Sequence, residues 1–192
     1  MDVGTTVYQG DTALGVVAEF VHLRLLSSRE RSPERDEEVA SKVRLRIADE
    51  VRRPGFLAVT TRIGSRLCGF GTAVLSADPA PEHPALGARR SQEWLAGAVR
   101  IADLVVAPAA RGRGVGTGLL DVLLLPAVDE RAWAVTDHQD TAALNFFRCR
   151  GRRQTVYPQP GARRAPPRSS SSLRGTRRCP RSLCCRSTNP AC

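Results

Sequence analysis

A strand, a loop and a helix follow one another in the stretch Val105-Val106-Ala107-Pro108-Ala109-Ala110-Arg111-Gly112-Arg113-Gly114-Val115-Gly116-Thr117-Gly118-Leu119-Leu120. Apolar residues recur at helical spacing from there to Pro126, so the glycines lie at a helix N-terminus. The first amides of a helix have no intrahelical partner, and the helix dipole favours an anion there. Glycine at 112, 114 and 116 keeps Cβ atoms away from these amides. The stretch therefore predicts a main-chain cradle for a phosphate or diphosphate.

The common phosphate-binding loops fit this stretch unequally. A P-loop needs Gly-x-x-x-x-Gly-Lys-Ser/Thr, and Lys42 is the only lysine of the chain, so a P-loop is excluded. A dinucleotide fingerprint, Gly-x-Gly-x-x-Gly, needs glycine where Thr117 or Leu119 stands, although Asp137 lies about twenty residues on, where a ribose-binding acid is expected. This weaker interpretation stays open, as does a turn that only joins a strand to a helix.

The same stretch resembles motif A of the GNAT N-acetyltransferase superfamily, Arg/Gln-x-x-Gly-x-Gly/Ala, which Arg111, Gly114 and Gly116 match. The resemblance implies acetyl-coenzyme A (acetyl-CoA) as co-substrate, with its pyrophosphate on the amides of the loop. It also implies that the pantetheine arm and thioester carbonyl lie along the exposed main chain of the preceding strand. The residues so assigned to the co-substrate are Leu104, Val105, Val106, Arg111, Gly112, Arg113, Gly114, Val115, Gly116 and Thr117.

Charge is unevenly distributed along the 192 residues, whose net charge is +10. Residues 141–192 contain twelve arginines and no acidic residue, so the first 140 residues, with seventeen basic and nineteen acidic groups, carry −2. The high pI therefore describes a tail. Nucleic acid is not expected to bind the folded part, and a polyanion is expected to bind the tail only without specificity, by counterion release.

The cysteines follow the same division, with four of the six after residue 178. Their spacing matches no paired zinc-ligand pattern, so no metal site is predicted. No apolar run follows a basic N-terminal stretch, and none approaches the length of a membrane span. The chain is therefore expected to be cytoplasmic, without a membrane partner.

Apolar periodicity divides the first 55 residues into a short strand over 5–8 and two helices. Asp11 is expected to cap the first helix, which carries apolar residues from 14 to 25 on one side. Ser32-Pro33-Glu34 begins the second, because serine caps, proline suits the first turn and glutamate complements the dipole. Its apolar stripe ends at Pro54-Gly55. The basic residues largely off that stripe, expected to be solvated, are Lys42, Arg44 and Arg46.

The remaining elements give the fold class. Segments 56–60 and 67–74 are predicted to form a hairpin through Ile63-Gly64-Ser65, and the alanine- and proline-rich residues 76–90 a loop. The strand over 101–106, the motif A helix and a strand over 132–136 suggest a βαβ crossover, followed by a helix over 141–147. This is the order of GNAT folds. We therefore expect an α/β protein, with a GNAT-like mixed central β-sheet flanked by helices.

The last of these helices departs from the family. Residues 143–152, Ala-Leu-Asn-Phe-Phe-Arg-Cys-Arg-Gly-Arg, align without gaps with the family pattern Ala-x-x-Phe-Tyr-x-x-x-Gly-Phe. Phe147 stands where a tyrosine often serves as general acid toward the departing CoA thiolate, so that hydroxyl is absent. Arg150 and Arg152 occupy positions that are normally apolar, where a buried guanidinium without a partner would be costly. Asp140 replaces a frequent asparagine.

Beyond Pro158 the chain is a run of Pro, Gly, Arg, Ser and Cys with little periodicity, which predicts disorder. We place an acetyl-CoA-binding domain at 1–157 and a disordered tail at 158–192. Residues 155–157 suit the start of a sixth strand, and nothing after them resembles a seventh. The sequence leaves open whether the last strand or strands of the sheet are present.

Acetyl transfer needs aligned reactants, a polarised thioester carbonyl and an acceptor for the amine's proton. Asp103, on the strand before the loop, is the candidate proton acceptor, directly or through water, while a solvated strand-start carboxylate is an equally open alternative. Glu93 and Trp94 are weaker candidates for an acceptor pocket, because such a tryptophan more often belongs to the core. The three histidines, His22, His83 and His138, have no partner at catalytic spacing. Cys149 could act as a thiol acid near position 147, but two residues along a helix turn it about 200° away.

The predicted function is N-acetyl transfer from acetyl-CoA to a primary amine, of a small molecule or of a protein, by direct attack. Two alternatives stay open. The first is a catalytically silent or truncated acetyl-CoA-binding module, which the missing tyrosine favours. The second is polyanion binding by the basic tail. No residue pattern specifies the acceptor or the oligomeric state.

Overall fold

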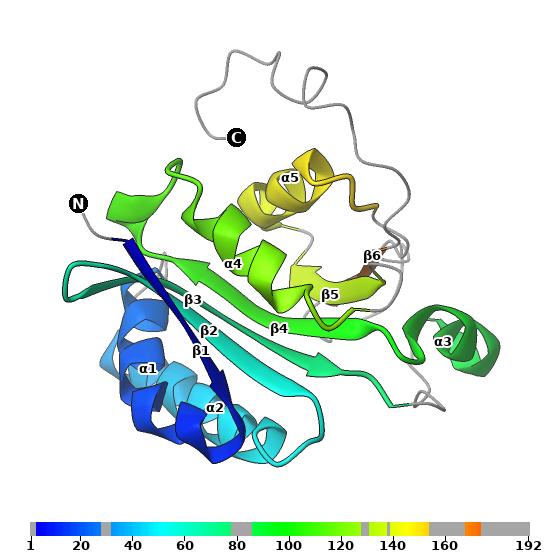
Figure 1. Cartoon of the computed structure of the whole chain (residues 1–192), viewed down its shortest axis with the longest axis horizontal. Coiled ribbons are helices and arrows are strands. Elements are labelled where there is room, and N and C mark those ends of the chain that lie inside the picture. Colours follow the sequence, from blue (N-terminus) through cyan, green and yellow to red (C-terminus); the bar gives the residue numbers. More distant parts are fainter. Residues whose placement is uncertain are drawn as a thin grey trace. The chain divides into compact units, whose positions relative to one another are not determined.

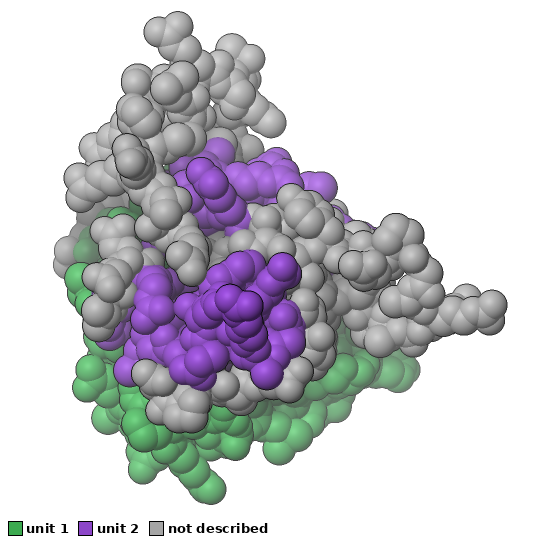
Figure 2. Space-filling view, turned by 90° about the vertical axis from the view of Figure 1, so that its right-hand side faces the viewer, with its two compact units in different colours: residues 1–74, 102–125 green, residues 75–101, 126–192 purple. Residues whose placement is uncertain are grey.

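The computed structural model describes residues 3–27, 32–77, 86–127, 131–137 and 139–153, and the backbone of 168–173. The chain forms two compact units, coloured separately in Figure 2. Unit 1 contains Met1–Val74 and Ala102–Leu125, and unit 2 contains Leu75–Ile101 and Pro126–Cys192. Strand β4, Val99–Val106, contributes its first residues to unit 2 and the others to unit 1.

The strands of unit 1 follow the order β1-β2-β3-β4 (Figure 1). Strand β1, Val3–Gln9, pairs antiparallel with β2, Phe56–Ile63, which pairs antiparallel with β3, Arg66–Leu75. The predicted first strand and hairpin are confirmed, and Gly64, with a φ of 60°, forms the turn. A register shift between Thr61 and Arg62 lies near the end of the hairpin.

The chain enters its first helix differently from the prediction. A 3-10 helix, η1, spans Gly10–Val16 and leads into α1, Val17–Leu26. Asp11 is not the cap: the Gln9 amide donates to Thr12 Oγ1 at 3.1 Å, and that hydroxyl donates to the Gln9 carbonyl at 2.7 Å. The prediction was wrong because the helical turn starts at Gly10, which moves the cap position to the residue before it.

Helix α2, Pro33–Glu50, begins as predicted. Ser32 Oγ accepts a hydrogen bond from the Arg35 amide at 3.2 Å, and Pro33 occupies the first turn. The stripe predicted for this helix includes Val43 and Ile47, both buried. Among the three basic residues expected to be solvated, Arg46 is the exception, because its side chain is only 29% exposed and forms an ion pair with Asp103 of β4.

Helices cover both faces of strand β3. Phe70 stacks on Phe20 of α1, with ring centroids 4.3 Å apart. Its neighbours Gly69 and Gly71 point the other way, since side chains alternate along a strand. There they meet α4, Val115–Leu123: a Cβ on Gly69 would lie 2.9 Å from Leu119 Cδ1. Helices α1 and α4 therefore flank opposite faces of the sheet in unit 1, as Figure 1 shows.

Replacing Gly71 by valine is expected to destabilise unit 1 by about 2 kcal/mol or more, a typical cost of overpacking. Even the first added carbon would lie 2.6 Å from Leu123 Cδ1 and 3.3 Å from the Asp103 carbonyl oxygen. Urea unfolding of the two proteins measures the difference. Gly4→Val on β1 is the matched control, because nothing lies within 4 Å of that position. If Gly71→Val and Gly4→Val unfold at the same urea concentration, the close approach of α4 to Gly71 of β3 is contradicted.

Unit 2 has the strand order β4-β5-β6. The first residues of β4 pair parallel with β5, Ala132–Asp137, and β5 pairs antiparallel with β6, Arg168–Leu173. The parallel pair, joined through α4, confirms the βαβ crossover. Helix α5, Thr141–Cys149, follows β5. Together with the antiparallel strands of unit 1, these pairings confirm the predicted mixed α/β sheet flanked by helices.

One prediction for unit 2 differs from the structure. The loop predicted over 76–90 is wrong at its end, because helix α3 spans Gly87–Leu95. The helix is favoured by an Arg89–Glu93 pair, 3.0 Å between Nε and Oε1, and by burial of Ser91 and Leu95 four residues apart. Within the tail predicted to be disordered, residues 168–173 are drawn as the short strand β6. That segment lacks proline and glycine, so its main chain can pair along β5.

The remainder of the tail, the predicted strand start at 155–157 and residues 78–85 lie outside the described residues. Within the described residues, no helix is long and apolar enough to cross a membrane. The same part of the chain contains no group of three or more His, Cys, Asp or Glu side chains arranged to hold a metal ion.

Candidate functional site

The glycine-rich loop lies between β4 and α4, all within unit 1. The Ala107 amide donates to the Cys68 carbonyl of β3 at 2.8 Å, which anchors the start of the loop. A single 3-10 turn, Pro108–Ala110, then redirects the chain. Gly112 and Gly114 have φ values of 72° and 81°, in the left-handed region that favours glycine. Two of the predicted glycines are therefore required by the backbone itself.

The first amides of α4 are available to a ligand. Gly114 is the N-cap and has no side chain to cap the helix, and the Gly118 amide makes the first helical bond, to the Gly114 carbonyl at 3.0 Å. The amides of Val115 and Gly116 precede that bond and so have no helical acceptor. Outside the helices of the described chain, the main-chain hydrogen bonds include none from the amides of residues 112–114.

The space in front of these amides is open. Residues 111–114 are exposed, and a Cβ placed on Gly114 would meet nothing within 4 Å. A diphosphate site needs main-chain donors that a ligand can reach, and the exposed residues 111–114 leave the approach to the start of α4 open. The donors fit the doubly charged pyrophosphate of acetyl-CoA.

Two guanidinium groups border the loop. Arg111 Nε donates to the Val106 carbonyl at 3.4 Å, which holds that side chain against the end of β4. Arg113 is exposed and forms no hydrogen bond or ion pair with any described residue. Arginine is well suited to bind phosphate oxygens. The ten residues assigned to the co-substrate thus lie on one continuous segment, from the end of β4 through the loop to the first turn of α4.

The parallel pairing of β4 with β5 is short. It joins Val99 to Ala132 and Ile101 to Ala134, and no described residue of β4 after Ile101 pairs with β5. Strand β5 itself continues to Asp137, paired with β6. The main-chain groups of Leu104–Val106, the positions assigned to the pantetheine arm, are therefore not used in a ladder with β5.

Asp103 is held in a network on the α2 side of the sheet. Its side chain is 9% exposed, so the alternative of a solvated carboxylate is wrong. Asp103 Oδ2 accepts a hydrogen bond from Arg46 Nη2 and another from Thr72 Oγ1, the latter at 3.1 Å. Sequence reasoning missed Arg46 because its partner lies 57 residues away. Its position between the buried residues Val43 and Ile47 was the available signal.

Helix α5, in unit 2, has the residues that depart from the family pattern. Asp140 caps it as asparagine would, since its Oδ1 accepts from the Ala143 amide at 3.0 Å. Phe147 is buried, 8% exposed, and packs edge-on against Phe146 with centroids 5.4 Å apart. Its ring offers no hydroxyl to a thiolate.

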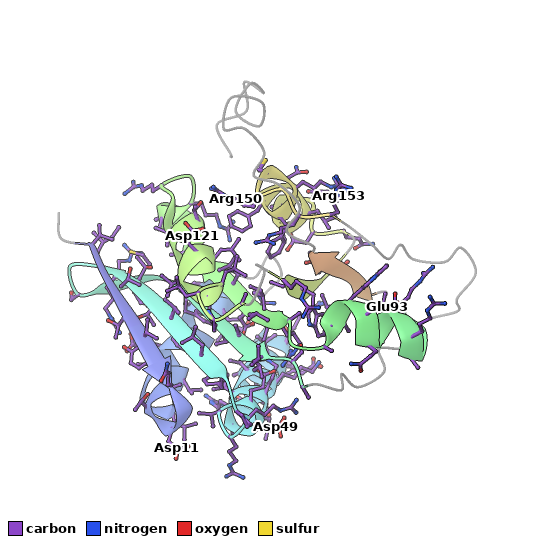
Figure 3. All side chains as sticks on the ribbon, turned by 45° about the vertical axis from the view of Figure 1, so that its right-hand side comes forward. Asp11, Asp49, Glu93, Asp121, Arg150 and Arg153 are labelled. Atoms are coloured by element: carbon purple, nitrogen blue, oxygen red, sulfur yellow. The ribbon has the colours of Figure 1, made fainter. Side chains whose placement is uncertain are left out.

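The two arginines of the pattern behave differently from each other. Arg150 is exposed, with its guanidinium 5.8 Å from the centre of the Phe146 ring; Figure 3 labels Arg150 and Arg153 near the end of α5. Arg152 is buried, and its amide donates to the Phe147 carbonyl at 3.0 Å, closing the helix with Gly151 at a φ of 73°. Of the two arginines, only Arg152 is therefore buried, and its side chain is not without a partner.

The weaker candidates lie elsewhere. Glu93 is paired with Arg89 on the surface of α3 (Figure 3), and Trp94 is half-buried with the Arg90 guanidinium 5.6 Å from its ring centre. Both belong to unit 2. His22 is exposed on α1. His83 and His138 lie outside the described residues, and Cys149 is a half-buried thiol.

Solved structures share this fold, and two of the following three are named as acetyltransferases. PH1933 from Pyrococcus horikoshii OT3 is similar with a TM-score of 0.63 and 15% identity, covering 91% of this chain and 99% of its own. PaiA N-acetyltransferase from Thermoplasma acidophilum, solved in complex with coenzyme A, has a TM-score of 0.60 and 13% identity. The match covers 91% of this chain and 99% of that protein. The structure described as histone acetyltransferase HPA2 and related acetyltransferase, from Corynebacterium glutamicum ATCC 13032, has a TM-score of 0.60 and 15% identity. The match covers 90% of this chain and 98% of that protein.

Identities this low establish the fold alone, and no curated protein matches the chain. The family itself is established by sequence. The model of the acetyltransferase (GNAT) family matches residues 20–151, more than half of the chain, and this segment includes the whole β4–loop–α4 site. The chain therefore belongs to the GNAT acetyltransferase family, whose co-substrate is acetyl-CoA.

Proposed function

We propose that this protein binds acetyl-CoA on the loop Arg111–Thr117 and transfers the acetyl group to a primary amine by direct attack. The observation that carries the proposal is the exposed loop of residues 111–114, with two glycines at positive φ, directly before the first amides of α4, which have no helical acceptor. These donors and the guanidinium of Arg113 would hold the pyrophosphate. The main chain of Leu104–Val106 would align the pantetheine arm and polarise the thioester carbonyl.

The bound co-substrate supplies an activated acetyl group. The amine nitrogen forms a bond to the carbonyl carbon, the carbon–sulfur bond breaks, and CoA leaves with the bonding electron pair and takes up a proton. The amine must also lose a proton. Asp103 is the proposed acceptor, directly or through a water molecule, because its Oδ1 has no hydrogen bond from any described residue, whereas Oδ2 accepts two.

The test is a calorimetric titration of the full chain with acetyl-CoA, followed by measurement of free thiol released in the presence of a panel of amines. Binding and thiol release with at least one amine support the proposal. Absence of binding contradicts it. Binding without release for any amine supports instead a catalytically silent acetyl-CoA-binding module, the second candidate. The buried phenyl ring of Phe147, in the place of the usual tyrosine, favours that candidate.

Phe147→Tyr separates the two candidates further. If Phe147 occupies the position of a general acid, a hydroxyl restored there is expected to raise kcat about tenfold or more, within the range of general acid catalysis, without changing the affinity for acetyl-CoA. Thiol-release kinetics measure the effect. Phe146→Tyr, one residue earlier, is the matched control. An unchanged rate would remove position 147 from the mechanism.

A further inference from the structure

We infer that the acceptor of this enzyme has an anionic group one or two carbons from its amine, as a free amino acid has, and that Arg46 binds that group. The inference rests on the proposed function and names its substrate class. The observation behind it is an ion pair between Arg46 and Asp103 that uses only part of each side chain.

The unused atoms are specific. Arg46 donates to Asp103 through Nη2 alone, and no described residue accepts from its Nε or Nη1. Asp103 accepts through Oδ2 alone, from Arg46 and Thr72, and its Oδ1 has no donor among the described residues. The Arg46 side chain is 29% exposed, so a ligand can reach it, whereas the Asp103 side chain is 9% exposed.

The ion pair places a cationic and an anionic group next to each other. A guanidinium such as that of Arg46 has five N–H donors in a fixed plane, which suits the carboxylate of a ligand. The Asp103 oxygen without a hydrogen bond suits the ammonium or amine N–H of the same ligand. A zwitterion has its two charges in the same arrangement and would satisfy both groups at once. A diamine would place a second cation beside Arg46, and the N-terminus of a peptide has no anion close to its amine. Both fit this pair less well.

The Arg46–Asp103 pair includes a residue of β4, the strand along which the acetyl group is proposed to be transferred. Arg46 comes from α2, Thr72 from β3 and Asp103 from β4, all within unit 1. Asp103 lies three residues before Val106, about 10 Å along an extended strand. An amino acid held by its carboxylate on Arg46 would present its amine to Asp103 Oδ1, which takes the proton as the carbon–nitrogen bond forms. Arg46 would thereby select the acceptor and orient it.

The experiment compares glycine, L-serine and L-phenylalanine with glycinamide, L-serinamide and L-phenylalaninamide. The amide keeps the amine and the shape of the acid and removes the negative charge. Thiol release by the full chain is expected to give a kcat/KM at least about tenfold higher for the best acid than for its amide, the size of one charge-assisted hydrogen bond. Spermidine and a tripeptide with a free N-terminus are expected to react less well than that acid.

Variants test the assignment to Arg46. Arg46→Gln is expected to raise KM for the acid and to reduce the preference over the amide to about twofold or less. Arg44→Gln is the matched control, since it removes the same charge from the same helix at a side chain that is 55% exposed. Arg46→Lys retains a cation beside Asp103 but lacks the planar fork, so it tests the same preference if the glutamine variant does not fold.

The outcomes separate this inference from the proposed function. If acetyl-CoA binds and an amide, spermidine or the peptide reacts as well as every acid, the inference is overturned and the proposed function stands. A preference for acids that survives both Arg46 variants also overturns it. If acetyl-CoA binds and no amine reacts, binding of the acids to the CoA-loaded chain decides: no binding, or equal binding of the amides, overturns the inference. If acetyl-CoA does not bind, both proposals fail.

Discussion

Gly114→Glu is expected to abolish binding of acetyl-CoA, with a rise in Kd of at least 100-fold, about 2.7 kcal/mol. Two effects act in the same direction. Gly114 has a φ of 81°, which a residue with a Cβ adopts only with strain. Its side chain would also extend into the open space before the first amides of α4 and place a negative charge close to the bound diphosphate.

Isothermal titration calorimetry of both proteins measures this loss. Gly10→Glu is the matched control: Gly10 also has a positive φ, 53°, and open space around it, and it follows β1 instead of β4. The control has the same strain and the same added charge, but its position is not part of the loop before α4. It is therefore expected to bind acetyl-CoA like the native chain. Binding by Gly114→Glu with native affinity would show that the diphosphate does not lie on this helix terminus.

Asp103→Asn is expected to lower kcat about 100-fold while leaving the affinity for acetyl-CoA unchanged, because an amide of the same shape cannot take a proton. Thiol-release kinetics under saturating acetyl-CoA measure the loss. The substitution also removes the counter-ion of Arg46, so thermal unfolding must show that the variant is folded at the assay temperature.

Asp121→Asn provides the comparison for this variant. Asp121 is an exposed carboxylate on α4, labelled in Figure 3, and the same change of charge there is expected to leave kcat unchanged. If Asp103→Asn retains native kcat, Asp103 serves only to pair with Arg46, and the amine loses its proton to solvent.

Much of the fold could be predicted from local patterns. Ser32 and Pro33 marked the start of α2, Gly64 the turn of the hairpin, and the glycines before α4 the change from strand to helix, because each acts through its own backbone or its next few neighbours. The start of η1 was missed because Gly10 and Thr12 offered the backbone a cap other than Asp11. Helix α3 was missed because alanine and proline upstream outweighed a short amphipathic segment.

Strand β6 depends on more than its local sequence pattern. Residues 168–173 have little periodicity and no apolar face, so their composition predicts disorder. They form a strand because β5 offers a row of main-chain donors and acceptors along which they can pair. An edge of this kind exists only once the neighbouring strand is in place.

The sequence by itself determined the family and predicted the loop proposed to bind the co-substrate, because a glycine loop before a helix places its amides through consecutive residues. Only the tertiary structure decided the surroundings of Asp103. Arg46 and Thr72 reach that carboxylate from α2 and β3, and no spacing along the chain encodes a meeting of side chains from separate elements. Packing brings the three together, and it leaves one oxygen of the Asp103 carboxylate without a hydrogen bond from any described residue.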